Sequence, residues 1–385
     1  MEEVKRNQTL LMPVGISFYT FQTAGYLIDV YRGNIQAEKN FLIYGLFAFF
    51  FPSVVSGPIG RAGELIPQFR DLKTKRLWNW ERILKGLLLM LWGFFLKLVI
   101  ADRIALFVNE VFDSYWLYGT VELLGAAFSY SIQLYCDFAS YSFMALGAAK
   151  IVGIELIDNF NVPYFAKSIP EFWHRWHISL STWLRDYVYI PLGGSRCSAF
   201  RNRVNLMITF LVSGIWHGAN WTYLLWGGMH GIYQVIGKGL KPVKAKLYRK
   251  LGIQEEWTGI VLGKVLITFL LTTLAWIFFR APSILDGFQF LERICTKWNP
   301  EVWIDHSWKY LGLDPKEWVV LGAALLILLA VDCIRYFGKL RIDEFVMKQS
   351  FVIRLGIIYV LLFMTLLYGV YGQGYDASQF IYFQF

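Results

Sequence analysis

Histidine is the side chain in this sequence whose type and position best suit chemistry. Four of the five histidines, His174, His177, His217 and His230, fall in a stretch of 58 residues, 173–230, that also holds six of the 16 tryptophans. An ionisable side chain is expensive in an apolar segment, so its presence there indicates a function by default. A neutral imidazole can take up a proton, which is the chemistry of a general base.

His217 lies in the motif Trp-His-Gly-Ala-Asn-Trp, with a glycine on either side of it. On a helix that runs unbroken from Arg203, His217 lies ~21 Å from the charged end, well inside a hydrocarbon core of about 30 Å. Asn220 and Trp221 then follow at i+3 and i+4 on the same face, where Asn220 is predicted to orient the ring. The alternative is a buried histidine that only bonds a carbonyl of a neighbouring helix.

His174 and His177 lie in the aromatic segment Glu-Phe-Trp-His-Arg-Trp-His-Ile-Ser-Leu-Ser-Thr-Trp-Leu-Arg-Asp. This pattern is typical of an interfacial or re-entrant helix with tryptophans at headgroup level, and a purely structural anchor explains it equally well. His230 falls about 220° round a continuous helix from His217, so it is predicted to be structural. His306 belongs to a polar loop and is predicted to be solvated.

Other catalytic chemistries find no support in the sequence. The i,i+3 spacing of His174 and His177 would suit a metal, but no HExxH motif or carboxylate cluster accompanies it, so no metal site is predicted. There is no GxSxG elbow, Walker loop or flanked GxGxxG unit. What remains is a deep histidine as the general base that deprotonates a hydroxyl attacking an activated acyl group.

The elements that position these histidines are predicted to be membrane helices. Hydrophobic residues make up 56% of the 385 residues and charged residues 17%, against roughly 25% charged in soluble domains. Mean hydropathy is +0.43. A disordered, collagen-like or disulfide-framework protein is excluded, and an all-α polytopic membrane protein is predicted. The net charge of +9 is assigned to cytoplasmic loops rather than to nucleic-acid binding, which is not expected.

Stretches poor in charge predict about eight or nine spans, since ~20 apolar residues cross the hydrocarbon core. They are Asn7–Ile28, Asn40–Gly60, Ile83–Ile100, Leu117–Tyr135, Phe138–Ile154, Val204–Gly237, Ile260–Phe279, Trp318–Val331 and Leu355–Tyr375. Pro52 and Pro58 predict a broken end to the second of them.

Loop charge predicts the orientation. Arg61–Arg82, Lys238–Lys250 and Arg335–Arg354 are rich in lysine and arginine and are predicted to be cytoplasmic. Ala101–Tyr118 and Arg280–Lys316 mix few basic residues with acids and are predicted to lie outside. Alternation of these loops requires the long run 204–237 to enter and leave on the cytoplasmic side, as a hairpin or a re-entrant pair.

Several motifs together closely resemble the membrane-bound O-acyltransferase (MBOAT) family, of the alginate O-acetyltransferase type. The resemblance covers residues 1–385 as one membrane domain, and relatives usually carry further membrane helices before Pro13, so the chain is expected to be N-terminally short. The motifs are Pro13-Val-Gly-Ile-Ser-Phe-Tyr-Thr-Phe-Gln, Phe51-Pro-Ser-Val-Val-Ser-Gly-Pro-Ile, Phe172-Trp-His-Arg-Trp-His-Ile-Ser-Leu-Ser-Thr-Trp-Leu-Arg-Asp-Tyr, Pro191-Leu-Gly-Gly-Ser-Arg, Trp216-His-Gly-Ala-Asn-Trp-Thr and Phe380-Ile-Tyr-Phe-Gln-Phe.

The resemblance implies a helical ring round a central tunnel, with His217 as the catalytic base and His177 as a second active-site polar residue. A thioester donor, acetyl-CoA, is expected to enter from the cytoplasm, with no permanently bound cofactor. From their charge, Arg175, Arg185 and the basic cytoplasmic loops are expected to attract its phosphates, although the positive charge of cytoplasmic loops in general explains them equally well. The residues expected to line the tunnel or orient substrates are Trp173, Arg175, Trp176, Trp216, Asn220 and Trp221.

The expected activity is O-acetyl transfer toward the hydroxyls of an exported, alginate-like polysaccharide. The expected location is the inner (plasma) membrane, and the expected partners are an extracytoplasmic acetyltransferase and a polysaccharide export machinery. Two alternatives stay open: O-acylation of peptidoglycan or a teichoic-acid-type polymer, and a transporter or assembly scaffold without chemistry.

Overall fold

The computed structural model describes residues 15–54, 56–76 and 78–371, and these contain helices and no strand. Three short 3₁₀ segments (Tyr115–Leu117, Pro163–Phe165 and Ser307–Tyr310) and two π-helical segments (η1, Phe95–Ala101, and η4, Arg185–Tyr189) accompany the α-helices. The α-helices are α1 (Ile16–Tyr31), α2 (Phe41–Ala48), α3 (Phe51–Val54), α4 (Ala62–Asp71), α5 (Trp80–Phe94), α6 (Asp102–Asp113), α7 (Thr120–Val152), α8 (Ile169–Arg175), α9 (Ile178–Leu184), α10 (Ala199–Trp216), α11 (Trp221–Leu251), α12 (Thr258–Arg280), α13 (Ile284–Thr296), α14 (Glu301–Ile304), α15 (Pro315–Gly338), α16 (Ile342–Met347) and α17 (Phe351–Tyr368).

The centre of the molecule is a pair of long helices. α5, η1 and α6 form one continuous helix of 34 residues, which packs along α7. The two backbones approach closely through glycines: a Cβ atom added at Gly86 would lie 2.7 Å from the carbonyl oxygen of Gly147, and one at Gly93 2.6 Å from that of Ser140. Small residues at such contacts are the usual basis of helix association in membranes.

Two sequence predictions are wrong in this central pair. The predicted spans 117–135 and 138–154 are one helix, α7, because Cys136 and Asp137 between them are buried and continue the helical backbone. The predicted outside loop 101–118 is mostly helix, because α6 prolongs the preceding span through Asp113. Charged residues led to both errors, since they were taken to mark the ends of spans.

A buried ion cluster accounts for charges in the middle of these helices. The Nζ atom of Lys97, in η1, lies 2.8 Å from an oxygen of Asp102 and 2.7 Å from an oxygen of Asp137 on α7. Buried charges persist where they are paired with good geometry. The cluster therefore links the two central helices through charge as well as through packing.

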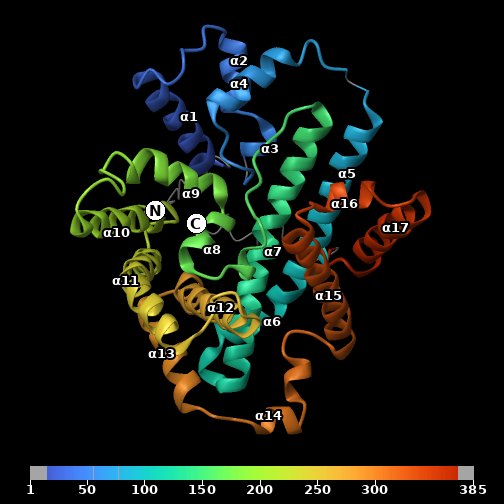
Figure 1. Ribbon diagram of the computed structural model, residues 1–385. Coiled ribbons are helices and arrows are strands. Elements are labelled where there is room, and N and C mark those ends of the chain that lie inside the picture. Colours follow the sequence, from blue (N-terminus) through green and yellow to red (C-terminus); the bar gives the residue numbers. More distant parts are fainter. Residues whose placement is uncertain (1–14, 55, 77, 372–385) are drawn as a thin grey trace, which may run out of the picture.

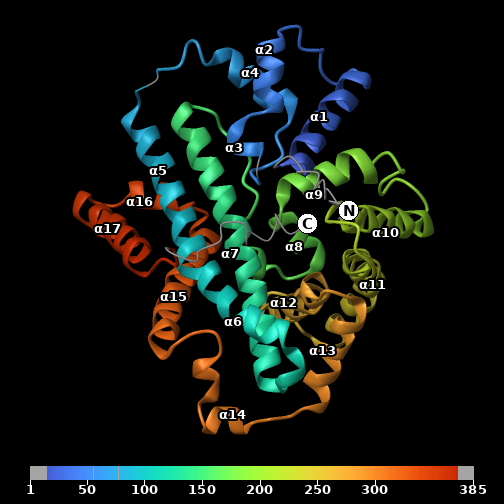
Figure 2. The same cartoon turned by 180° about the vertical axis from the view of Figure 1, so that it is seen from behind.

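Four helices of the described residues are long and apolar enough to cross a membrane: the continuous helix Trp80–Asp113, α12, α15 and α17. Only 11% of the apolar window of α17 is buried, so most of its apolar surface is free to face lipid. Figures 1 and 2 show α15 and α17 on one side of the central pair and α10 to α13 on the other. The count of eight or nine spans stays a prediction.

Helices α1 to α4 gather at one end of the molecule, and α14 lies at the opposite end (Figures 1 and 2). The predicted break in the second span is confirmed, because α2 ends at Ala48 and α3 is a separate short helix. The first eight residues of the first predicted span, 7–14, lie outside the described residues. Gln22 on α1 is buried and is satisfied by the carbonyl of Phe47 and the amide of Gly60.

α10 and α11 form the predicted hairpin. Gly214 packs on Tyr223, Gly227 on Phe210 and Gly231 on Met207, so the two helices run antiparallel. The turn between them, residues 217–220, carries His217.

Candidate active site

His177 lies at a sharp turn between two short helices. α8 starts at the Ser168 cap, whose hydroxyl accepts from the amide of Glu171 (3.3 Å), and it ends at Arg175. His177 then adopts a left-handed conformation (φ 42°) and α9 begins at the next residue. A residue other than glycine in this region is strained, and such strain concentrates at functional sites. The predicted single interfacial helix is therefore two helices, with His177 at the kink between them.

The kink separates the two neighbouring histidines. His174 is exposed, whereas the side chain of His177 is 1% exposed and packs against Phe138 (ring centroids 4.6 Å apart) and Phe18 (6.4 Å). Neither ring nitrogen of His177 has a hydrogen-bond partner among the described residues. Across these residues there is also no group of three or more histidine, cysteine or acidic side chains placed to hold a metal ion.

His217 ends α10, and the chain turns there instead of continuing as a helix. Gly218 follows with φ +146°, a conformation that suits glycine alone, and a Cβ atom there would lie 2.9 Å from the ring of Tyr223. The helix that the sequence suggested is therefore broken at the histidine itself. The apolar run gave no proline to signal this break.

The break changes the roles predicted for the two residues after it. Asn220 caps α11: its Oδ1 atom accepts from the amide of Thr222 (3.0 Å) and its Nδ2 atom donates to the carbonyl of Pro282 (3.3 Å). The unbroken helix had implied that Asn220 orients the ring of His217. In the structure Asn220 stabilises the turn instead. Trp221 is 73% exposed and does not share a helix face with His217, so the prediction that it shares that face is wrong.

One tryptophan joins the two candidate catalytic histidines. The ring of Trp216 lies 6.0 Å from that of His177 and 4.7 Å from that of His217, between ring centroids. Phe279 on α12 (5.1 Å) and Trp226 on α11 (5.0 Å) also contact the ring of His217. Together with Phe18 and Phe138, these residues come from five helices and build one aromatic enclosure around both imidazoles.

His230 belongs to the same enclosure, although a continuous helix would have turned it away. Its ring lies 5.1 Å from Trp226, which also contacts His217. The indole Nε1 of Trp173 donates to His230 Nδ1 at 3.2 Å, so the proton of this neutral imidazole is on Nε2. The 220° argument failed because the turn at 217–220 interrupts the rotation.

The remaining residues that were predicted to belong to the site either pack in the core or form ion pairs near the surface. Trp176 is buried between Phe172 (5.4 Å) and Trp276 (5.2 Å). Arg175 pairs with Glu171 (2.9 Å), so its guanidinium is already engaged. Arg185 lies at the surface and pairs with its neighbour Asp186 (2.7 Å).

Four contributors to the enclosure were not predicted: Phe18, Phe138, Trp226 and Phe279. They come from α1, α7, α11 and α12. Phe18 lies in the motif that begins at Pro13 and Trp226 in the tryptophan-rich stretch, whereas Phe138 and Phe279 carry no signal beyond the high aromatic content of the chain.

Burial sets the protonation states of His177 and His217. Both residues lie at turns between helices, outside the four long apolar helices. Loss of solvent lowers the pKa of His177 well below its ordinary value, and the neighbouring His217 lowers it further. Loss of solvent likewise lowers the pKa of His217. Both rings are therefore neutral, so each can accept a proton at one nitrogen and donate a hydrogen bond from the other.

Comparison with known proteins shows the family of the chain. The profile of the membrane-bound O-acyltransferase family matches residues 34–279, a range that includes both His177 and His217. The chain therefore belongs to the membrane-bound O-acyltransferase family, as its motifs predicted, and it is a membrane protein.

The names of the similar proteins describe enzymes of acyl transfer. The chain is 39% identical over 290 residues to the probable alginate O-acetylase AlgI of Pseudomonas aeruginosa, covering 74% of this chain and 51% of that protein. It is 37% identical to the peptidoglycan O-acetyltransferase of Helicobacter pylori (74% and 56% covered) and 32% identical to the teichoic acid D-alanyltransferase of Streptococcus thermophilus (72% and 70%). The chain spans about half the length of the alginate relatives.

Proposed function

We propose that this chain is the catalytic part of a membrane O-acetyltransferase, which transfers acetyl from acetyl-CoA toward the hydroxyls of an exported, alginate-like polysaccharide. The observation that carries the proposal is the pair of buried, neutral histidines, His177 and His217, which both pack against Trp216. Family membership supports the reaction class, and the alginate relatives support the acceptor.

In the proposed reaction His217 is the general base. The acceptor hydroxyl gives its proton to the imidazole as its oxygen attacks the thioester carbonyl carbon. The tetrahedral intermediate then expels the sulfur of coenzyme A, which takes the proton back from the imidazolium. The products are an acetyl ester and free coenzyme A, and the protein supplies no nucleophile. A general base of this kind contributes ~10²–10⁴-fold to the rate.

His177 acts on the carbonyl oxygen in this scheme. Its ring nitrogens have no hydrogen-bond partner among the described residues, and an unsatisfied buried polar group costs about 1–3 kcal/mol. A substrate oxygen satisfies one of them. An N–H donor fixed at the site of developing negative charge stabilises the transition state. The strained turn at residue 177 is consistent with a ring held in place before substrate binds.

The aromatic enclosure is proposed to be the middle of a substrate tunnel within a helical ring. The donor enters from the cytoplasm, and the acceptor side, where an extracytoplasmic acetyltransferase and the export machinery engage, faces outward. The opposite positions of α4 and α14 support this arrangement, because the basic segment 61–82 and the segment 280–316, which contains α13 and α14, then lie on different sides of the inner membrane.

Labelling of single cysteines tests the orientation. A membrane-impermeant thiol reagent applied to intact cells should label a cysteine placed in 301–304 and spare one placed in 73–76. The reverse pattern contradicts the proposed polarity.

Peptidoglycan is the second candidate acceptor, because the relative named for it is almost as similar as the alginate relatives (37% against 39% identity). The acetyl content of alginate-like polymer and of peptidoglycan, measured with and without the gene, distinguishes the two. If the protein were a scaffold or a transporter, membranes that contain it would release coenzyme A only at the background rate. That result would refute acyl transfer.

A further inference from the structure

A groove with about 870 Å³ of space lies far from the histidines in the fold, where the start of α5 meets α16 and α17. None of its lining residues belongs to the aromatic enclosure. The lining combines apolar and charged side chains: Trp80, Glu81, Leu84, Lys85, Leu340, Glu344, Met347, Lys348 and Arg354.

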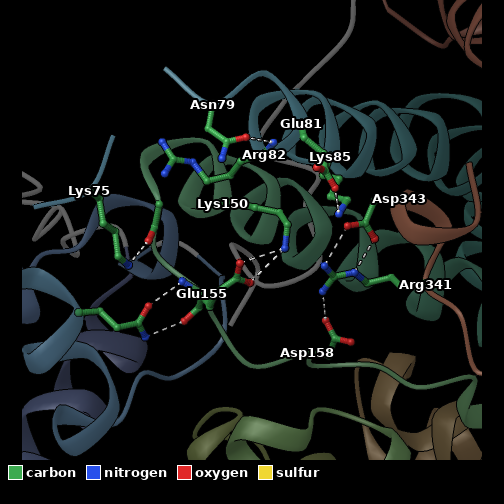
Figure 3. A network of polar contacts seen from close by, with 12 residues as sticks. Lys75, Asn79, Glu81, Arg82, Lys85, Lys150, Glu155, Asp158, Arg341 and Asp343 are labelled. Atoms are coloured by element: carbon green, nitrogen blue, oxygen red, sulfur yellow. Dashed lines mark hydrogen bonds and ion pairs between the residues drawn. The ribbon is translucent and has the colours of Figure 1, made fainter. Parts of the chain in front are cut away.

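The walls of the groove are held in place by ion pairs and hydrogen bonds. Figure 3 shows Glu81 and Lys85 on α5 beside Arg341 and Asp343 at the start of α16. The guanidinium of Arg341 lies 2.6 Å from buried Asp343 and 3.0 Å from Asp158, which follows α7. The groove is thus bounded by elements that are fixed to one another, as preformed binding sites are.

Three cationic side chains line the groove, and they differ in the number of ion pairs and hydrogen bonds that they already make. Lys85 pairs with Glu81 at 2.6 Å, and Arg354 donates to the carbonyls of Met347 (2.7 Å) and Gln349 (3.2 Å). Lys348 is exposed and has no ion-pair partner within the described part of the chain. Its ammonium is therefore available to an anion that enters the groove.

The apolar walls continue onto a surface that suits lipid. Trp80 is exposed and its ring lies 5.6 Å from that of exposed Trp78, as tryptophans at a membrane interface do. α17 begins beside the groove with Phe351 (70% exposed) and Val352 (77%), and it is one of the four apolar helices. A soluble phosphate would find charge here but would leave these apolar walls uncovered.

We propose that this groove binds one anionic phospholipid. Its phosphate pairs with Lys348, with Lys85 nearby, and its acyl chains lie along Leu84, Leu340 and the exposed face of α17. Basic pockets between membrane helices on the cytoplasmic side recognise anionic headgroups in this way. The bound lipid bridges α5 and α17, and so joins the central helix to the least buried of the four apolar helices.

The test is native mass spectrometry of the purified full chain, titrated with phosphatidylglycerol or with phosphatidylcholine of the same acyl chains. The proposal expects one tightly retained phosphatidylglycerol and weaker retention of phosphatidylcholine. Lys348→Gln should weaken phosphatidylglycerol binding about fivefold, from the ~1 kcal/mol that a lysine contributes near an anionic surface. Lys348→Glu should weaken it further.

Lys73→Gln is the matched control, because Lys73 is an exposed lysine in a segment predicted to face the same side. It should leave binding unchanged, and the melting temperature in detergent should show that all variants fold. Equal retention of the two lipids overturns the proposal, as does equal weakening by Lys73→Gln and Lys348→Gln. Displacement of the lipid by inorganic phosphate or by coenzyme A would assign the groove to a soluble phosphate instead.

Discussion

Gly218 is the residue on which the position of the proposed base depends most. Its φ of +146° is open to glycine and strained for any other residue, which costs about 1–3 kcal/mol. The methyl group of alanine would also meet the Tyr223 ring at 2.9 Å, and that ring lies 6.4 Å from His217 and 5.0 Å from Phe279. Gly218→Ala should therefore destabilise the protein by about 1–3 kcal/mol and move the ring of His217.

In this variant the activity per folded molecule should fall as well, beyond any loss of folded protein. A displacement of about 1 Å at a reacting group can lower the rate by ~10²-fold. The assay is coenzyme A release per folded molecule, combined with thermal unfolding in detergent.

The matched control is Gly237→Ala, in the interior of α11, where an added Cβ meets no atom within 4 Å. Alanine is the better helix former by about 0.5–1 kcal/mol, so this variant should be slightly stabilised and fully active. If Gly218→Ala is as stable and as active as Gly237→Ala, the turn does not position His217 and the reasoning is refuted.

Two further predictions concern the central ion cluster and the third buried histidine. Lys97→Met should destabilise the protein by about 3–5 kcal/mol, because it leaves two buried carboxylates without their cation; Lys85→Met, which breaks an exposed pair on the same continuous helix, should change the melting temperature little. His230→Ala should lower the melting temperature while turnover per folded molecule stays near wild type, since Trp173 then loses its acceptor; a specific loss of turnover would make His230 part of the chemistry.

The class of the fold could be predicted because it follows from composition. A chain with 56% hydrophobic and 17% charged residues cannot bury all its apolar side chains in the interior of a soluble protein. The α10–α11 hairpin was predicted from the charge of the loops. The limits of the helices could not be predicted in the same way. Lys97, Asp102 and Asp137 interrupt the apolar pattern, but their mutual neutralisation in three dimensions lets α6 and α7 continue through them.

The site was predicted in part for similar reasons. The window that contains His177 and His217 is visible in the sequence, and so is the glycine after His217. The turn at Gly218 is not, because an isolated glycine in an apolar run is compatible with both a helix and a break. Once the helix is broken, Asn220 becomes a cap and His230 rotates into the enclosure. Contacts such as Phe138 on His177 join residues far apart in sequence and carry no local signal.

The central claim is that His217 is the base and His177 a supporting donor. The most direct measurement is coenzyme A release per folded molecule, with acetyl-CoA as donor, for alanine and asparagine variants at both positions and for His306→Ala as control. The account predicts that His217→Ala and His217→Asn both lose ~10²–10⁴-fold, because neither side chain takes up a proton at neutral pH. His177→Asn should retain more activity than His177→Ala, because an amide can still donate to the carbonyl oxygen, and His306→Ala should match wild type. Normal turnover by folded His217→Ala would contradict the account.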